Sequence, residues 1–353
     1  MREFVYTGLP GRVVFGLGAL RHLERELDLL GVKRVLVLST AEKASQAEEL
    51  SVRLGARSAG VCARAVMHVP VAVAREGVAA ARNSGADCTL AVGGGSTTGL
   101  AKAIALETGF PIVAVPTTYA GSEMTPIQGF TDGGLKRTQR DAKMLPRVVI
   151  YDPSLTVSLP RGLSATSGLN AIAHAAEGLY AQDNNPIMNL VAEEGIRALA
   201  EGLPKVLGDP ADLEGRGECQ YGAWLCGMVL GSVGMALHHK LCHTLGGSFD
   251  LPHAETHSVV LPYALAYNSA AAPQAMLRIA RALGTASAAT GVYDLARRLD
   301  APASLAALGL READLDRAAD LATQSPYWNP RPLDRGALRA LLDDAYRGRP
   351  PAD

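Results

Sequence analysis

Short apolar runs alternate with amphipathic stretches over about the first 155 residues of the chain. The apolar runs are four or five residues long and are bounded by glycine, proline or polar residues; they cover 35–39, 89–92, 112–115 and 148–151. Runs of this kind are typical of strands that are buried on both faces. The segments 42–53 and 71–84 between them have the pattern of helices. This alternation predicts an α/β domain with a parallel sheet and helices on its faces.

The pattern changes in the second half, where Ala, Leu, Glu and Arg dominate and β-branched runs largely vanish. Apolar residues recur there at spacings of three and four, clearly so over 187–203 and 275–283, as in amphipathic helices. The stretch 151–160 between the halves carries prolines, which discourage continuation of a helix. We therefore expect an α/β domain over residues 1–158 and an all-helical domain over residues 159–353.

The composition limits the class and the partners. The 353 residues include 34 basic and 35 acidic side chains, and 48% are hydrophobic, as in soluble globular proteins of about two domains. No block of like charge marks a surface for nucleic acid or an anionic membrane, so we expect small molecules or a second copy of the chain as partners. The five cysteines form no close CxxC pair and the first residues lack an apolar signal segment, which favours a reduced, cytoplasmic protein.

One uncharged segment, 221–237, needs a separate explanation. It carries Gly227 and Gly231 at the GxxxG spacing of membrane helix pairs, and its 17 residues are at the lower limit for a spanning helix. The segment is solitary, is interrupted by four glycines and is followed at once by histidines. We therefore expect a buried core helix rather than a membrane span.

Two loops rich in glycine and hydroxyl groups follow predicted strands. In the first loop, Gly94, Gly95 and Ser96 lie between the strand at 89–92 and a helix expected to begin near Thr98. Bare backbone N–H groups at such a helix start suit a pyrophosphate. A tight turn from strand to helix is the alternative explanation of these glycines.

The second loop follows the strand at 112–115 and contains Thr117, Thr118 and Ser122. Ligands of open α/β sheets bind at the carboxyl ends of the strands. Two such loops at one edge of the sheet favour an extended ligand that carries phosphate. Taken singly, each loop is also explained by hydroxyl groups that cap a helix.

Six of the eight histidines lie close together in the second half of the chain. His239 and His243 are four residues apart and would share one face of a helix, and His253 follows after a short loop. Asn170 and His174 form another pair at this spacing. A lone buried histidine is usually structural, but such pairs can converge on a metal ion, an anion or a substrate carbonyl. The cluster therefore predicts a functional site.

With these motifs, the chain resembles the iron-containing alcohol dehydrogenase superfamily and, within it, the maleylacetate reductases. The segments that carry the resemblance are, in chain order, FVYTGLPGRVVFGLGAL, AVGGGSTTGLAKAIALETGFPIVAVPTTYAGSEMT, LPRVVIYDP, LSATSGLNAIAHAAEGLYA, HHKLCHTLGGSFDLPHAETHSVVLPYALAYN and WNPRP. The resemblance implies a Rossmann-like NAD(P)-binding domain followed by an all-helical domain, as in the dehydroquinate synthase-like fold. It places the nicotinamide in the cleft between them.

The resemblance also assigns residues to the cofactor. It implies contacts with the pyrophosphate or along the cofactor for Gly94, Gly95, Ser96, Thr117, Thr118 and Ser122. The ribose would be bound just after the strand that ends at Leu38, where this chain has Ser39 and no acid. An acid there would favour NADH, so we expect both NADH and NADPH to be accepted.

In metal-bearing relatives, an Asp and three His hold the ion, and the corresponding positions here are Asn170, His174, His239 and His253. Maleylacetate reductases share this Asn. A neutral amide supplies only a dipole where an Asp supplies charge, so we expect no tightly bound metal. A zinc or iron ion held by the three remaining histidines stays open as the alternative.

The reaction that the resemblance implies is the NAD(P)H-dependent reduction of the C=C bond of maleylacetate to 3-oxoadipate, in the catabolism of aromatic compounds. Hydride that arrives β to the ketone pushes negative charge onto the ketone oxygen, and a proton must then reach the adjacent carbon. We assign polarisation of the ketone or proton donation to His243 and His253, and orientation of the substrate to His174 and His239. His243 is also implied to lie next to the nicotinamide.

The two substrate carboxylates need cationic or amide donors. Asn170 is one candidate, and Arg137 and Lys143 in a basic loop are others, although a solvated surface loop explains these two equally well. Gln128 and Tyr263 stand where similar reductases often have Trp and His. Because of these two differences, the alternative remains that the chain is a related alcohol dehydrogenase or reductase that acts on another unsaturated keto acid or on a carbonyl.

Two further expectations concern assembly and class. The family and the hairpin-like opening segment, 4–15, suggest a homodimer that forms through edge strands. A catalytically silent metabolite-binding oligomer is the alternative outside the enzymes. The intact glycine-rich loop and the histidine cluster speak against that alternative.

Overall fold

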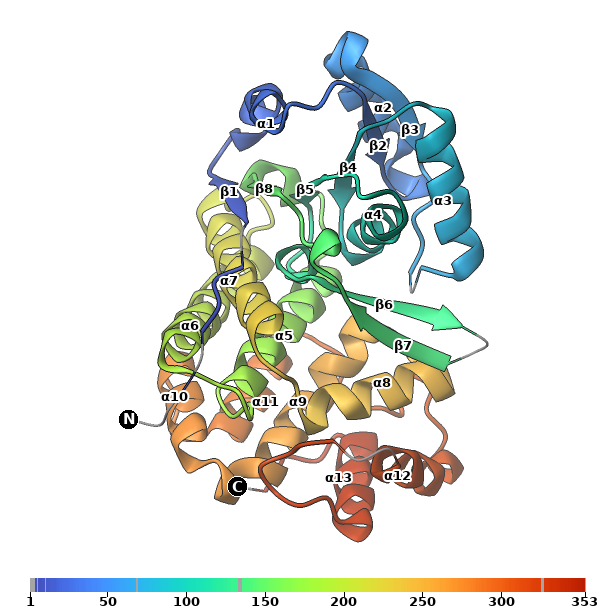
Figure 1. The fold of residues 1–353 in the computed structure, drawn as a ribbon. Coiled ribbons are helices and arrows are strands. Elements are labelled where there is room, and N and C mark those ends of the chain that lie inside the picture. Colours follow the sequence, from blue (N-terminus) through green and yellow to red (C-terminus); the bar gives the residue numbers. More distant parts are fainter. Residues whose placement is uncertain are drawn as a thin grey trace. The chain divides into compact units, whose positions relative to one another are not determined.

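The structure, a computed structural model, describes residues 4, 6–9, 11–67, 69–132, 135–324 and 327–352, without the side chains of 130–132 and 135–137. The chain forms two compact units (Figure 1). We call Gly8–Leu159 the sheet unit, and the unit that begins at Pro160 the helical unit. The order of elements confirms the expected fold class, an α/β unit followed by a helical one.

A parallel sheet of six strands forms the centre of the described part of the sheet unit. In spatial order the strands are β1 (Arg12–Phe15), β8 (Val148–Tyr151), β5 (Ile112–Pro116), β4 (Cys88–Gly93), β2 (Val35–Leu38) and β3 (Ser58–Cys62). All neighbouring pairs are parallel, as expected. The apolar runs correctly predict the four inner strands. They do not predict β3, because this edge strand is only partly buried and lacks a continuous apolar run.

The first strand also differs from the expectation of a hairpin over segment 4–15. β1 is a single strand at the edge of the sheet and pairs in parallel with β8. Residues 6–9 before it belong to no strand. A parallel pair needs a long connection rather than a tight turn, and the described residues 6–9 accordingly do not form the first strand of a hairpin.

Helices cover both faces of the sheet (Figure 1), and they are α1 (Leu23–Leu30), α2 (Ala44–Leu54), α3 (Val71–Asn83) and α4 (Gly95–Thr108). Alternate residues of β2 point to opposite faces. Val35 and Val37 pack into one core with α1 and α2, whereas Leu36 and Leu38 pack into a second core with α3 and α4. The predicted helices over 42–53 and 71–84 are thus present as α2 and α3.

Two segments of the sheet unit differ from the sequence-based expectation. α4 begins at Gly95 rather than near Thr98, because the carbonyl of Gly94 already accepts the backbone N–H of Thr98. The basic segment expected to be a loop is strand β7 (Leu135–Arg140), which forms an antiparallel hairpin with β6 (Ile127–Asp132) outside the main sheet.

The helical unit contains long helices joined by short loops. In chain order they are α5 (Arg161–Gly178), α6 (Pro186–Gly208), α7 (Leu213–Ser232), α8 (Leu237–Phe249), α9 (His253–Asn268), α10 (Pro273–Leu283), α11 (Ala288–Arg298), α12 (Leu315–Thr323) and α13 (Arg335–Arg347). α5 lies in the middle of the unit and is buried from Ser164 to Gly178. The predicted helices over 187–203 and 275–283 are present as parts of α6 and α10.

The apolar segment 221–237 is largely buried, as expected, but it is not one helix. α7 ends at Ser232 and α8 begins at Leu237, with a bend of 95° between them. Val233 is extended at the break, with φ −134° and ψ 164°. In the described part of the chain, no single helix is long and apolar enough to cross a membrane, and this bent pair alone passes such a test as a pair.

Glycines allow α6 and α7 to pack closely. A Cβ atom on Gly222 of α7 would lie 2.9 Å from the carbonyl oxygen of Gly195 and 3.0 Å from the backbone nitrogen of Leu199, both on α6. These backbone atoms cannot move aside as a flexible side chain would. The glycines of the segment 221–237 therefore include at least one that helix packing within the unit requires.

We expect Gly222→Ala to lower the free energy of unfolding by about 2 kcal/mol, because the cost of overpacking exceeds the gain in helix propensity. Urea unfolding followed by circular dichroism measures this change. Gly162→Ala in the first turn of α5 is the matched control, since a Cβ there meets nothing within 4 Å. Equal stability of the two variants would contradict the packing argument.

Candidate active site

The two glycine- and hydroxyl-rich loops lie together at the carboxyl ends of β4 and β5. The backbone N–H of Thr117 donates to the carbonyl of Gly93 at 3.0 Å. A Cβ atom on Gly94 would lie 2.8 Å from Cγ2 of Thr118, so only glycine fits beside the second loop. Gly95 is exposed at the first turn of α4, and its helix start offers backbone N–H groups to an anion. The loops expected to hold the pyrophosphate are therefore adjacent in the structure.

A buried lysine forms hydrogen bonds that hold the end of the second loop, the one after β5, in place. Nζ of Lys102, on α4, donates to the carbonyl of Ser122 at 2.7 Å, to Oγ1 of Thr125 at 2.9 Å and to the carbonyl of Ile127 at 2.7 Å. Burial lowers the pKa of Lys102 to about 7, and the neighbouring Glu123 carboxylate opposes this shift. These three hydrogen bonds hold in place the segment that carries Ser122.

Ser39 lies at the carboxyl end of β2, as the sequence predicts. Its side chain is buried, and its hydroxyl donates to the carbonyl of Thr40 at 3.0 Å. Its backbone carbonyl accepts the N–H of Ala65, which connects the end of β2 to the chain after β3. No acidic residue occupies position 39 or 40, but Glu42 follows in the next turn. The predicted contact of Ser39 with the ribose stays a prediction.

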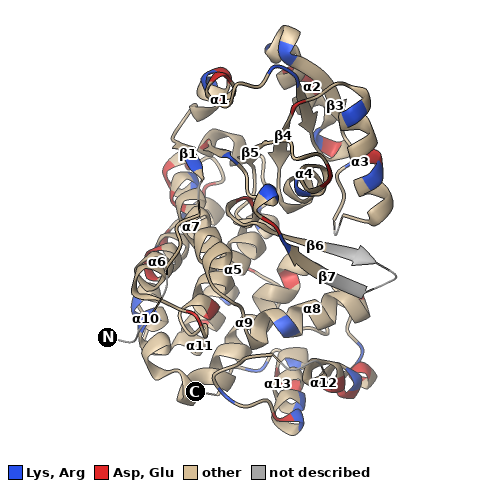
Figure 2. Cartoon of the chain, in the orientation of Figure 1, with Lys and Arg blue, Asp and Glu red and all other residues tan. Residues whose placement is uncertain are grey.

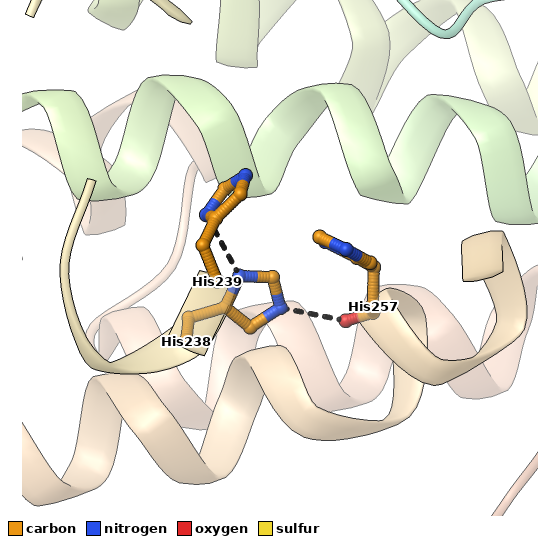
Figure 3. Close-up of side chains that lie close together, drawn as sticks. All are labelled: His238, His239 and His257. Atoms are coloured by element: carbon orange, nitrogen blue, oxygen red, sulfur yellow. Dashed lines mark hydrogen bonds between the residues drawn. The ribbon is translucent and has the colours of Figure 1, made fainter. Parts of the chain in front are cut away.

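Three helices of the helical unit bring six histidines together: His174 on α5, His238, His239 and His243 on α8, and His253 and His257 on α9. The ring centres of His174 and His239 are 5.1 Å apart, and those of His239 and His243 are 6.3 Å apart. The ring centres of His253 and His257 are 4.3 Å apart. The four histidines predicted as catalytic therefore belong to one cluster, which we call the histidine cluster. Figure 3 shows His238, His239 and His257 within it.

A single buried carboxylate, that of Glu177 on α5, organises the start of α8. It accepts the backbone N–H groups of Ala236, His238 and His239 at 3.0, 2.7 and 3.3 Å. Its Oε2 also accepts a hydrogen bond from Nδ1 of His239, with 2.6 Å between the two atoms. The side chain is fully buried. Burial would raise the pKa of Glu177, but the hydrogen bond and positive potential of His239 and the other donors hold it at about 2, so the group is ionised.

These hydrogen bonds fix which ring nitrogens carry protons. A carboxylate only accepts, so Nδ1 of His239 carries a proton and donates it in the hydrogen bond to Glu177. Nε2 of His238 donates to the carbonyl of His257 at 3.0 Å, which leaves Nδ1 of His238 as the acceptor. A carboxylate that orients a histidine in this way is common behind metal-bound and catalytic imidazoles.

Burial keeps three rings of the histidine cluster uncharged. It lowers the pKa of His238 to about 4, and it lowers the pKa of His174 and of His257 well below the ordinary value. The neighbouring imidazoles add to each shift, because a second positive charge nearby is unfavourable. At neutral pH these three rings are therefore neutral donors and acceptors of hydrogen bonds.

The predicted substrate residues lie in different surroundings. Asn170 is buried one turn before His174 on α5, and its Oδ1 has no protein partner within hydrogen-bond distance. Lys143 is exposed in the sheet unit. The side chain of Arg137 lies outside the described residues. The structure thus brings Asn170 to the histidine cluster and leaves the two basic residues without a described place in it.

The two positions that differ from similar reductases are engaged within the protein. Nε2 of Gln128 donates to the carbonyl of Gly99 at 3.1 Å, and its Oε1 accepts from Gln139 at 3.3 Å. The hydroxyl of Tyr263 donates to the carbonyl of Arg349 at 2.9 Å. Both side chains thus have internal partners, which weakens the argument that they reshape the substrate site.

Three residues of this site were not predicted from the sequence. They are Glu177, His238 and His257. Glu177 is three residues after His174 and His257 is four residues after His253, so helical spacing could have indicated both. His238 lies beside His239, and no sequence spacing distinguishes it from a structural histidine.

The imidazole nitrogens of the histidine cluster are suitable ligands for a metal ion, but the cluster lacks an anionic ligand that would balance the charge of the ion. His238, His239 and His257 present nitrogen atoms that lie within 4.8 Å of one another, and imidazoles bind zinc or ferrous iron. Asn170 contributes a neutral amide, however, and the Glu177 carboxylate already accepts N–H groups from the protein. A divalent ion would therefore have no anionic ligand among these residues.

Comparison with known proteins gives full-length relatives. Residues 10–153 match the family described as iron-containing alcohol dehydrogenase, and residues 164–346 match the C-terminal part of the Fe-containing alcohol dehydrogenase family. Maleylacetate reductase of Burkholderia cepacia is 60% identical over 352 residues, which are 100% of each chain. The structure of maleylacetate reductase from Rhizobium sp. strain MTP-10005 is 56% identical with a TM-score of 0.96, and the match covers 99% of this chain and 100% of that one. A protein from Ralstonia eutropha JMP134, named as a candidate alcohol dehydrogenase, is 64% identical with a TM-score of 0.98 over 100% of both chains.

We expect Glu177→Gln to lower the free energy of unfolding by about 3 kcal/mol, because the amide N–H₂ would face backbone N–H donors that the carboxylate now satisfies. Urea unfolding measures the loss. Glu201→Gln is the control, since Glu201 forms an exposed ion pair with Arg197 that contributes little. A stability of Glu177→Gln within about 0.5 kcal/mol of that control would contradict the assigned role.

Proposed function

The chain belongs to the iron-containing alcohol dehydrogenase family, and we propose that within this family it acts as a maleylacetate reductase. It is an NAD(P)H-dependent oxidoreductase that reduces the C=C bond of maleylacetate to give 3-oxoadipate, in the catabolism of aromatic compounds. The observation that carries this conclusion is the match to maleylacetate reductases over the full length of both chains. The presence of Asn170 one turn before His174, whose burial lowers the pKa of its imidazole well below the ordinary value, supports it.

The sheet unit supports binding of the cofactor in the proposed domain over residues 1–158. Glycine-only positions and an open helix start at the carboxyl ends of β4 and β5 suit a pyrophosphate. The proposed contacts are Gly94, Gly95, Ser96, Thr117, Thr118 and Ser122, with Ser39 at the ribose. Bound in this way, NAD(P)H supplies the hydride, and the chain supplies the orientation of the nicotinamide.

The histidine cluster, in the proposed domain over residues 159–353, supports the remaining steps. Hydride reaches the carbon β to the ketone, and the C=C electron pair moves to give an enolate whose oxygen needs donors. We assign this polarisation, or the proton that the adjacent carbon receives, to His243 and His253. His174 and His239 orient the substrate, and the hydrogen bond between Nδ1 of His239 and Glu177 fixes the direction of the His239 ring.

The substrate carboxylates need separate donors in this proposal. The Nδ2 group of Asn170 is one, since this residue lies beside His174 on the same helix. Arg137 and Lys143 are the other proposed donors, and both belong to the sheet unit. Each would form a charge-assisted hydrogen bond with a carboxylate.

We further propose that no divalent ion is held tightly. The argument rests on the neutral Asn170 and on the Glu177 carboxylate, whose hydrogen bonds are already made within the protein. If an ion is bound, His238, His239 and His257 are the residues that would hold it, and it would polarise the ketone as a Lewis acid.

A homodimer in the cytoplasm completes the proposal. β1 is an edge strand with one side unpaired by the described residues, and Phe15 and Leu17 near it are exposed. An edge of this kind suits pairing with a second copy of the chain. All five cysteines are buried and outside any disulfide, which agrees with a reducing compartment.

We expect purified, chelator-treated protein to oxidise NADH rapidly when maleylacetate is added, because neutral imidazoles rather than an ion stabilise the enolate. Loss of absorbance at the NADH band measures the reaction, and a second sample with added zinc or ferrous iron is the control. Activity that appears only on addition of the ion would overturn the metal-free proposal. Inactivity in both samples would overturn the proposed substrate.

We expect NADPH to replace NADH with measurable efficiency, because position 39 is a serine that does not repel a 2′-phosphate. The ratio of kcat/KM for the two cofactors with maleylacetate is the measurement. A preference for NADH greater than about a hundredfold, roughly 2.7 kcal/mol, would contradict the role assigned to Ser39.

A further inference from the structure

His257 lies at the centre of the histidine cluster, on α9 one turn after His253. Its ring centre is 4.3 Å from that of His253, 4.8 Å from that of His238 and 5.0 Å from that of His239. The ring centre of His174 on α5 is 6.5 Å away. Figure 3 shows the ring of His257 close to those of His238 and His239, which belong to α8. Among the described histidines, His239 also lies near four others, but its Nδ1 already bonds to Glu177.

The hydrogen bonds of this side chain are incomplete in a buried position. His257 is fully buried, and neither Nδ1 nor Nε2 has a protein partner within hydrogen-bond distance. A neutral imidazole carries one N–H donor and one acceptor nitrogen, and each buried group that lacks a partner destabilises the fold. His238 differs, because its Nε2 donates to the backbone carbonyl of His257. The fold therefore leaves polar ring atoms of His257 without hydrogen bonds, which destabilises it, whereas it provides a hydrogen bond for the ring of His238.

Further polar atoms without protein partners accompany this ring. They are Oδ1 of Asn170 and Nδ1 of His174 on α5, and Nε2 of His239 on α8. All three residues are buried. Buried polar groups are almost always satisfied, so several incomplete ones on neighbouring helices indicate a place for a polar ligand. The ketone and the two carboxylates of the proposed substrate only accept hydrogen bonds, so a ring N–H such as that of His257, and not the carbonyl oxygen of Asn170, can bind them.

We propose that His257 is a catalytic residue that donates a ring N–H to the ketone oxygen of the unsaturated keto acid and stabilises the enolate oxygen after hydride transfer. This inference rests on the proposed function. The hydride leaves C4 of NAD(P)H and forms a C–H bond at the carbon β to the ketone. The C=C electron pair becomes the enolate, and the cofactor becomes NAD(P)+. A proton from His243 or His253 then forms the second C–H bond and restores the ketone.

The surroundings of His257 suit this role. The ring is fully buried among four other imidazoles, so it lies in a water-poor site. A neutral imidazole that polarises a carbonyl is an established way to stabilise an enolate in a water-poor site. The ring N–H of His257 can also stay hydrogen-bonded to the ketone oxygen, and then to the enolate oxygen, throughout the reaction.

The test compares variants of His257 with a control on the same helix. His257→Leu removes both ring nitrogens, and we expect kcat with maleylacetate to fall by about 10²–10³-fold. The Kd for NADH, measured by fluorescence without substrate, should stay within about twofold. The midpoint of urea unfolding should be unchanged or higher, because buried polar atoms without protein partners are removed.

The control is Val260→Ala, one turn further along α9, where a fully buried apolar side chain packs in the core. This variant should lower the unfolding midpoint and leave kcat within about threefold. If His257→Leu fails to fold, His257→Gln keeps an amide N–H, and we expect kcat to fall only about tenfold to a hundredfold.

The inference about His257 is overturned if His257→Leu retains kcat within threefold, or if its kcat falls only in step with its unfolding midpoint. It is also overturned if the wild-type protein carries one equivalent of metal that His257→Leu loses, since the ring would then be a metal ligand. Inactivity of the wild-type protein with maleylacetate would overturn the proposed function, whatever the variants do.

Discussion

The site in the helical unit depends on one buried carboxylate. Glu177 accepts the N–H groups at the start of α8 and the ring N–H of His239, so it fixes both the position of that helix and the protonation of one imidazole. A buried carboxylate is costly unless such donors surround it. The break between α7 and α8 is the local consequence, because the chain must turn at Val233 to present its amides to Glu177. Without this anion, the ring of His239 would lose the hydrogen bond to Glu177 that orients it.

The hydrogen bonds of the Glu177 carboxylate within the protein also determine which groups the histidine cluster can offer to a ligand. Because Glu177 is occupied by N–H donors and Asn170 is neutral, the cluster offers imidazoles and an amide but no free negative charge. Such a set can donate to a developing enolate and accept from its neighbours. The cost is visible in His257, whose buried nitrogens have no protein partner. In natural proteins, buried polar atoms without hydrogen-bond partners occur mainly at functional sites. Blue and red residues are frequent on α12 and α13 in Figure 2.

The sequence predicts the parts of the fold that have a strong periodic signal. The four inner strands, the fold class and the pairing of His239 with His243 on one helix face are all present in the structure. The edge strand β3 lacks a continuous apolar run, so periodicity does not reveal it, and the pattern of segment 4–15 indicates a hairpin where β1 is a single parallel strand. Glu177 was missed for another reason. Its role depends on amides that lie about 60 residues further along the chain, and no local pattern records such a contact.

The most direct test of the account follows the hydrogen that the cofactor gives up. NADH deuterated at both C4 positions, with maleylacetate and the purified protein, yields a product that NMR and mass spectrometry can map. The account predicts one deuterium on the methylene carbon β to the ketone of 3-oxoadipate, with hydrogen from water on the α carbon. Deuterium on a carbinol carbon, in a hydroxy acid that keeps its C=C bond, would contradict it and would identify a carbonyl reductase.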